Sequence, residues 1–230
     1  MKVVKLFRRA QFAWIAMNER YLNIDTSDQV QYEETPGWWR GPKTSAARHQ
    51  DNCAYGTPDY YYVYRIIRVL DPQPDDVVYD IGSGKGRILC VMSRRSVKKC
   101  VGIELFEELC VAARANAAKM RGRRAPIEIR CEDASVADVS DGTIYFLFNP
   151  FGKETLTEML LNIENSLSRN PRRVRIVYYN SVCRDVFDGC KWLKRYSEFR
   201  TFNGLEIAFY ESTSARSAVV EASSEGGILR

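Results

Sequence analysis

Hydrophobic and polar positions alternate in blocks along most of the chain, and the blocks predict strands and helices in turn. Short apolar runs of strand length cover 77–82, 100–105, 127–132, 143–150 and 174–180. Helical patterns precede or separate them at 58–70, 86–96, 106–122 and 153–169, and a short helix is expected at 182–188. Two last strands are predicted at 191–201 and 205–212, joined near the sequence "FNG".

Alternating strands and helices indicate a mostly parallel sheet with helices on both faces. Right-handed crossovers make such a sheet doubly wound and Rossmann-like, here with seven strands. The last strand must run antiparallel to its neighbour, because only a turn separates the final pair. The expected fold class is therefore α/β, with ligands bound at the carboxyl ends of the strands.

The two ends of the chain differ from this pattern. Residues 1–54 are expected to form an N-terminal cap, a helix followed by an irregular segment, and residues 55–212 the main domain. Within 1–22 the apolar positions recur at helical spacing: Leu6, Phe7, Ala10, Trp14, Met17 and Tyr21. This helix is expected to pack on the domain, with contact to a membrane surface as the alternative. The Ser-, Ala- and Gly-rich tail 213–230 is expected to be disordered.

Composition narrows the class of protein only modestly. The net charge of +5 is compatible with RNA binding, but the basic clusters at 94–99, 121–124 and 169–175 also suit solvated helix ends and loops. Seven cysteines without a CxxC pair indicate a reducing, cytoplasmic location. The single histidine, His49, is expected in a surface loop, and no metal site is expected. No apolar run is long enough for an integral membrane segment, and the oligomeric state stays open.

A glycine-rich loop follows the first predicted strand in "YDIGSGKGR", and its candidate binding residues are Asp80, Gly82, Ser83, Gly84 and Gly86. Such a loop lets the backbone approach a ligand, and the next helix offers its positive N-terminal end. The P-loop pattern fails because Lys85 is followed by Gly86. The dinucleotide pattern GxGxxG also fails, since the third glycine comes one residue early. The remaining Asp-x-Gly-x-Gly-x-Gly pattern is typical of S-adenosylmethionine-binding loops, in which an acidic residue suits the charged amino acid.

Polar residues also stand at the ends of the next strands. Glu104, followed by Leu105, ends the second strand, where a carboxylate can accept both hydroxyls of a ribose. Asp133 and Ala134 follow the third strand, well placed for the amine and ring edge of adenine. Asn149 ends the fourth. Each residue alone could be an ordinary turn or cap residue, but four such features at successive strand ends favour a cofactor site.

On these residues the sequence resembles the class I S-adenosylmethionine-dependent methyltransferases, over about 55–212. It is most similar to a bacterial group that shares "GSGKGR", "NPFG", "YYN" and a segment like "ERYLNIDTSD" (19–28). The glycine loop and "YGTP" (55–58) are also similar to the non-SET histone-lysine methyltransferases, in which a loop closes over the cofactor. The resemblance implies S-adenosyl-L-methionine as cofactor and contacts from Tyr55, Gly56 and Thr57 to its methionine part. A simple turn before the helix is the alternative.

"NPFG" resembles the Asn/Asp-Pro-Pro-aromatic motif of amino-group methyltransferases. There the Asn side chain and a proline carbonyl accept amine hydrogens while the ring packs on the acceptor, which implies these catalytic roles for Asn149, Pro150 and Phe151. The second proline is missing, so the alternative is a strand end followed by a core phenylalanine. The expected function is methyl transfer to an amino nitrogen of a protein or nucleic acid. A small-molecule methyltransferase and a non-catalytic cofactor-binding protein are the alternatives.

Overall fold

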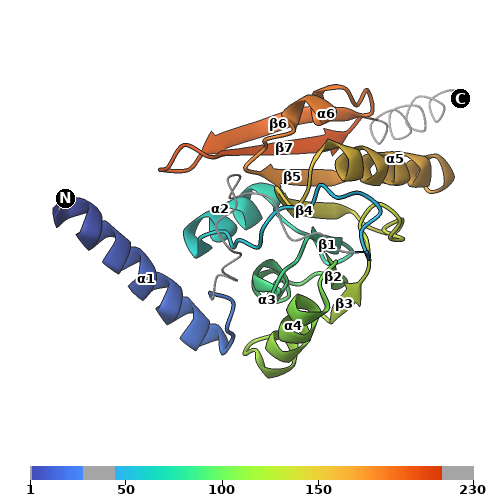
Figure 1. The fold of residues 1–230 in the computed structure, drawn as a ribbon. Coiled ribbons are helices and arrows are strands. Elements are labelled where there is room, and N and C mark those ends of the chain that lie inside the picture. The colour runs from blue at the N-terminus through green and yellow to red at the C-terminus, as the bar shows by residue number, and fades with distance from the viewer. Residues whose placement is uncertain (1, 28–44, 214–230) are drawn as a thin grey trace, which may run out of the picture.

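A seven-stranded mixed sheet forms the centre of the computed structural model, which describes residues 2–27 and 45–213 (Figure 1). The strands are β1 Val77–Ile81, β2 Lys99–Glu104, β3 Ile127–Cys131, β4 Ile144–Phe148, β5 Arg175–Tyr179, β6 Leu193–Arg200 and β7 Glu206–Ser212. Their spatial order is β3-β2-β1-β4-β5-β7-β6. β1 to β5 pair in parallel, while β7 runs antiparallel to both β5 and β6. The predicted fold class is confirmed.

Helices cover both faces of the sheet, as Figure 1 shows. They are α1 Lys2–Leu22, α2 Tyr60–Leu70, α3 Arg87–Met92, α4 Glu107–Lys119, α5 Lys153–Arg169 and α6 Arg184–Asp188. Apolar residues of α2 and α3 share one buried cluster with one face of the sheet, and residues of α5 and α6 share a second cluster with the other. Every residue of β1 and β5 is buried, as expected for strands covered on both sides.

The turn between β6 and β7 returns the chain so that β7 lies between β5 and β6. Thr201 N donates to Leu205 O (2.9 Å) to close it, and Gly204 adopts a φ of +85°. Phe202 at the tip is 83% exposed. The sequence predicted this turn and the antiparallel direction of β7, but not its insertion between two strands.

α1 departs from the prediction that its apolar face packs on the domain. Trp14, Met17 and Tyr21 are 38%, 55% and 60% exposed. The helix is instead held at its C-terminal end, where Asn18, Glu19 and Leu22 are buried. In Figure 1 the rest of α1 extends away from the sheet. Among the described side chains of residues 9–17, Ile15 packs against the core cluster and the others are exposed, so the expectation of a packed apolar face was wrong for this part of the helix.

Parts of the predicted terminal regions lie outside the described residues. They comprise 28–44 of the N-terminal cap and 214–230 of the tail, so the predicted division into a cap, a main domain and a tail stays a prediction. Among the helices that the structure does describe, none has the length and apolar character needed to cross a membrane.

Candidate active site

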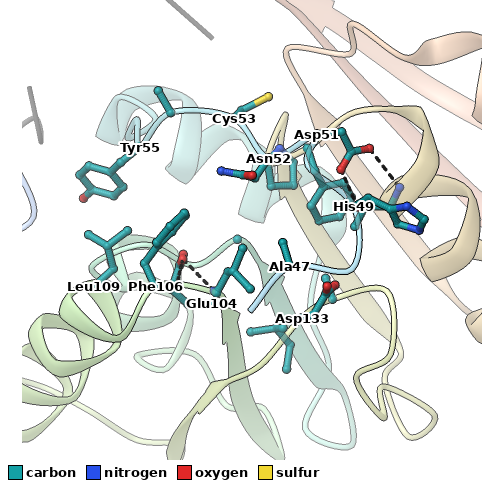
Figure 2. A pocket seen from close by; sticks show the side chains of 18 of the residues that line it. Ala47, His49, Asp51, Asn52, Cys53, Tyr55, Glu104, Phe106, Leu109 and Asp133 are labelled. Atoms are coloured by element: carbon teal, nitrogen blue, oxygen red, sulfur yellow. Dashed lines mark hydrogen bonds between the residues drawn. The ribbon is translucent and has the colours of Figure 1, made fainter. Parts of the chain in front are cut away.

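A pocket lies where the carboxyl ends of β1 to β4 meet, at the edge of the sheet predicted to bind ligands. Gly82, Glu104, Asp133 and Pro150 line it from these four strand ends. The segment 47–56 forms the opposite wall. Figure 2 shows that segment, from Ala47 to Tyr55, facing Glu104, Phe106 and Asp133. One segment that precedes the sheet thus closes a site built from four strand ends.

The glycine loop after β1 has a backbone that only glycine adopts easily. Gly82, Gly84 and Gly86 have φ values of +73°, +52° and +81°. A Cβ on Gly82 would lie 2.4 Å from Pro150 Cβ, and one on Gly84 would lie 2.2 Å from a ring carbon of Tyr55. Both approaches are too close for any side chain. The loop is therefore in direct contact with the end of β4 and with the ring of Tyr55.

Glu104 is buried at the end of β2 and binds the glycine loop. Its Oε2 accepts from Gly84 N (2.8 Å), and its Oε1 accepts from Leu105 N (2.8 Å) and Phe106 N (3.0 Å). Burial raises the pKa of Glu104, and these N–H groups oppose that rise. A carboxylate has about four acceptor positions, so capacity remains for a hydroxyl group in the pocket.

Asp80 lies beneath the loop and does not line the pocket. Its side chain is 3% exposed, and burial, together with the nearby Glu104 carboxylate, raises its pKa well above the ordinary value. Two acidic groups therefore stand close together at the ends of β1 and β2. A cationic ligand group beside them would relieve the cost of ionising both.

Because burial opposes the charge of Asp80, we expect Asp80→Asn to raise the free energy of unfolding by about 1–2 kcal/mol at neutral pH. A carboxyl whose pKa is raised in the folded state stabilises the fold below its unfolded pKa, about 3.9, and loses that contribution as pH rises through the folded value. The gain should therefore grow from about pH 4 to neutral pH in urea unfolding. A pH-independent gain would contradict the explanation. Asp75→Asn, at an exposed position, is the matched control.

Asp133 and Ala134 line the pocket after β3, as the sequence predicted for the cofactor site. Asp133 Oδ1 accepts from Ser135 N (2.8 Å), and Oδ2 accepts from Arg48 N. Burial opposes ionisation, but these backbone donors outweigh it and lower the pKa of Asp133. Glu132 Oε1 also lines this region, buried without a hydrogen-bond partner. An unpartnered buried oxygen beside a pocket fits a polar ligand.

The residues after β4 already have hydrogen-bond or core-packing partners within the protein, which the motif resemblance does not imply. Asn149 Oδ1 accepts from Tyr178 OH (3.2 Å), and Pro150 O accepts from Cys53 N (2.8 Å). Phe151 is 7% exposed and belongs to the core cluster beneath α5, although it also borders the pocket. Asn149 has a φ of +40° and lines a neighbouring pocket with Cys53. An acceptor amine at Asn149 would have to share its oxygen with Tyr178.

His49 and Asp51 attach the 47–56 segment to α5. The Asp51 carboxylate accepts from Thr155 N (3.1 Å) and Thr155 Oγ1 (2.6 Å), and Asp51 O accepts from Gly152 N (2.7 Å). His49 lies 3.4 Å from a Glu154 oxygen and 3.1 Å from a Glu158 oxygen, and its side chain is only 22% exposed. His49 lies in a loop, as expected, but it is only partly exposed and it lines the pocket.

A buried ion pair links the N-terminal cap to the helix that follows the glycine loop. Arg87 Nη2 lies 3.1 Å from Glu19 Oε1, with both side chains less than one-tenth exposed. Arg87 Nε also donates to Thr26 Oγ1 (2.8 Å), and Tyr55 OH donates to Thr26 O (2.9 Å). The "ERYLNIDTSD" segment therefore holds both Arg87 and the tyrosine that covers the glycine loop.

The structure brings half of the predicted cofactor residues to one pocket, whereas Thr57, Asp80, Ser83, Gly84, Gly86 and Asn149 do not line it. The predicted residues that line it are Tyr55, Gly82, Glu104, Leu105, Asp133 and Ala134. Thr57 and Asn149 line neighbouring pockets. Ser83 lies against β2 instead: a Cβ on Gly102 would lie 2.7 Å from Ser83 Oγ, which is buried without a hydrogen-bond partner. The lining residues that sequence reasoning missed are Ala47, His49, Asp51, Asn52, Cys53, Ala54, Ile103, Phe106, Leu109, Glu132, Phe148 and Thr155. Phe106 was foreseeable, since it follows Glu104-Leu105 directly.

Comparison with solved structures agrees with this geometry. An RNA methyltransferase from Salinibacter ruber, in complex with S-adenosyl-L-homocysteine, is similar with a TM-score of 0.54 and 25% identity, covering 70% of this chain and 95% of that one. An S-adenosylmethionine-dependent O-methyltransferase from Thermotoga maritima has the same TM-score at 17% identity, covering 70% and 68%. The chain therefore has the fold of the class I S-adenosylmethionine-dependent methyltransferases.

Sequence comparison is more specific for part of the chain. Residues 48–131 match the family of the histone methylation protein DOT1, so this part, from Arg48 to the end of β3, is DOT1-like. A protein-lysine N-methyltransferase of Saccharolobus islandicus (strain REY15A) is 31% identical over 90 residues. That match covers 38% of this chain and 56% of the relative. The predicted resemblances to the class I S-adenosylmethionine-dependent methyltransferases and to the non-SET histone-lysine methyltransferases are confirmed.

Proposed function

We propose that the protein is a methyltransferase that uses S-adenosyl-L-methionine to methylate the amino nitrogen of a lysine side chain in a protein. The observation that carries the proposal is the coincidence of the DOT1-like region with the pocket. Residues 48–131 supply the covering segment, the glycine loop, Glu104 and β3. The relationship to a protein-lysine N-methyltransferase supports the choice of acceptor.

The residues that line the pocket fit the proposed cofactor. Glu104 would accept a ribose hydroxyl at its remaining acceptor position, and Asp133, Ala134 and Leu105 would lie against adenine. The amino-acid part would lie over the glycine loop, with Asp80 beneath it and Tyr55 above. The unpartnered oxygen of Glu132 is available to a further polar group.

When bound, S-adenosyl-L-methionine would supply an electrophilic methyl group on a sulfonium. The lysine would react as the neutral amine, after its ammonium proton passes to solvent, and the neutral thioether would leave as the new C–N bond forms. The chain's own residues need only hold the two reactants in line and exclude water. We assign Asn149 and Pro150 to the acceptor side of this arrangement, with Phe151 supporting them from the core. The free lone pair of Asn149 Oδ1 is the feature that suits an amine hydrogen.

Two other acceptors remain as candidates. The similarity to an RNA methyltransferase, over 95% of that chain, favours RNA as the second candidate. A small molecule is the third. All seven cysteines are free, which supports a reducing compartment, and we propose the cytoplasm.

The test of the proposed function is a transfer assay with tritiated S-adenosyl-L-methionine against protein, RNA and small-molecule fractions of a cell lysate. We expect label in the protein fraction, on lysine after hydrolysis. Asn149→Gly should lower turnover roughly tenfold or more without changing cofactor affinity, because glycine tolerates the φ of +40° and only the carboxamide is lost.

Leu161→Ser, at a half-exposed position of α5, is the matched control for Asn149→Gly. Label confined to RNA would replace the proposed acceptor by the second candidate. Label in no fraction, together with no cofactor binding, would reject the methyltransferase proposal. Unchanged turnover in Asn149→Gly would remove Asn149 from the acceptor site but leave the proposed activity intact.

A further inference from the structure

A second pocket, of about 700 Å³, lies among α1, the start of α2 and the β6–β7 turn. Its volume is within the range of small-ligand sites. Half of the described residues that line it are aromatic: Trp14, Tyr61, Tyr62, Phe148, Tyr179 and Phe202. The pocket at the carboxyl ends of β1 to β4, here called the cofactor pocket, shares only Phe148 with this second pocket among the described residues, so cofactor binding does not explain the other rings.

Specific contacts join the three elements around this aromatic pocket. Gln11 Nε2 donates to Asp59 Oδ2 (3.1 Å), which ties α1 to α2. Phe202 N donates to Tyr62 OH (2.7 Å), which ties the β6–β7 turn to α2. The rings of Tyr61 and Phe202 stack with centroids 6.1 Å apart. The aromatic pocket is therefore a built feature and not a gap between independent elements.

The rim of the aromatic pocket is unusually apolar for a protein surface. Phe202, Tyr61 and Trp14 are 83%, 49% and 38% exposed. Scattered exposed rings are ordinary, but a group of them around one opening marks an interaction site. The part of α1 that does not pack on the domain contributes Trp14 to this group, so the exposure of α1 is explained if a partner covers it.

The charge of the aromatic pocket selects among partners. Asp59 is the only charged residue among the described residues that line it, although the chain as a whole carries +5. Among the lining residues that the structure describes, a phosphate-bearing ligand would meet a carboxylate and no cation. A cationic side chain would meet a carboxylate and several ring faces, both of which attract it. The lining thus favours a basic protein segment over a nucleic acid.

The aromatic pocket also borders the candidate active site. Phe148, the last residue of β4, lines both pockets. Gly56 lines the cofactor pocket, while the next residue, Thr57, lines the aromatic pocket. A long side chain that enters through the aromatic pocket would therefore approach the place where the transferable methyl group is proposed to lie.

We propose that α1, the start of α2 and the β6–β7 turn form the docking surface for the methyl acceptor, a lysine-bearing protein segment. The rings pack on the alkyl chain of the lysine, and Asp59 attracts its positive charge. This inference rests on the proposed methyl transfer and assigns to α1 a role in recognition of the acceptor.

The test measures binding of the full chain to three fluorescent probes: a lysine-containing peptide, its norleucine counterpart and a single-stranded RNA of similar length. We expect the lysine peptide to bind best. Asp59→Asn and Phe202→Ser should each weaken its binding roughly tenfold while cofactor affinity stays unchanged. Asn caps a helix as well as Asp does, so the first variant removes the charge and keeps the cap on Tyr61 N. The Gln11 amide can turn so that its oxygen accepts from the substituted carboxamide, which keeps the link to α1. Phe202 is too exposed for its loss to unfold the protein.

The matched controls are Asp75→Asn and Leu161→Ser, which should leave peptide binding unchanged. The inference is overturned if the norleucine peptide binds equally well, if the RNA binds more tightly, or if sedimentation shows that a second copy of the chain covers the aromatic pocket. Peptide binding that depends on both residues without any methyl transfer would reject the proposed function and keep the docking surface. Lysine methylation that neither variant affects would keep the proposed function and reject the docking surface.

Discussion

Replacing Arg87 by methionine should lower the free energy of unfolding by about 3–5 kcal/mol, the expected cost of removing one partner of a buried ion pair. Arg87 is 3% exposed, and its guanidinium group lies 4.6 Å from the centre of the Tyr60 ring. Methionine can fill much of the space, but Glu19 would remain buried without its cation. The loss would come mainly from that uncompensated charge.

Urea unfolding of four proteins checks this expectation: the wild type, Arg87→Met, Glu19→Gln and the double variant. The double variant should lose less stability than the sum of the two single losses, because the two side chains form one unit. Arg95→Met, at an exposed position of the same region, is the control and should change stability by less than about 0.5 kcal/mol. An Arg87→Met loss as small as the control, or additive losses in the double variant, would contradict the coupling.

This ion pair explains two sequence motifs that were noticed separately. "ERYLNIDTSD" contributes Glu19 and Thr26, and "GSGKGR" contributes Arg87. Both motifs were recognised by resemblance, but nothing in the spacing indicated that they touch across 68 positions of the chain. The structure turns two local signals into one physical connection, between α1 and the helix that presents the glycine loop.

Local patterns were sufficient for most of the fold and for the centre of the site. Fully apolar strands such as Val77–Ile81 have few alternatives in a chain of this length, and parallel strands bring their carboxyl ends together. The alignment of Glu104 and Asp133 beside the glycine loop follows from that rule alone. The prediction succeeded where one element and its immediate end determined the outcome.

Long-range contacts account for what the sequence did not reveal. The insertion of β7 between β5 and β6 depends on which strand of the hairpin pairs with β5. Hydrophobic periodicity does not determine this, because it does not encode strand order. His49 lines the pocket because the nearby Asp51 accepts a hydrogen bond from the first turn of α5, about a hundred positions further along the chain. The apolar positions of α1 predicted burial. Periodicity shows only that a helix has an apolar face, and does not show whether that face packs on its own domain or on another molecule.

The largest effect expected on ligand binding is that of Glu104→Ala, which should weaken S-adenosyl-L-methionine binding roughly hundredfold or more. The variant removes the proposed acceptor of a ribose hydroxyl and leaves three N–H groups, those of Gly84, Leu105 and Phe106, without their partner. Calorimetry on wild type and variant measures the difference directly. Glu108→Gln, exposed on α4, is the matched control.

The pH dependence of the same binding distinguishes a ribose-binding carboxylate from a merely structural one. Burial raises the pKa of Glu104, and a protonated carboxyl has lost acceptor capacity, so affinity should fall as pH decreases through that raised pKa. Glu104→Gln should bind weakly but with little dependence on pH in the same acidic range. Equal affinity of Glu104→Ala and wild type would contradict the ribose role, whereas no binding by the wild type would contradict the cofactor itself.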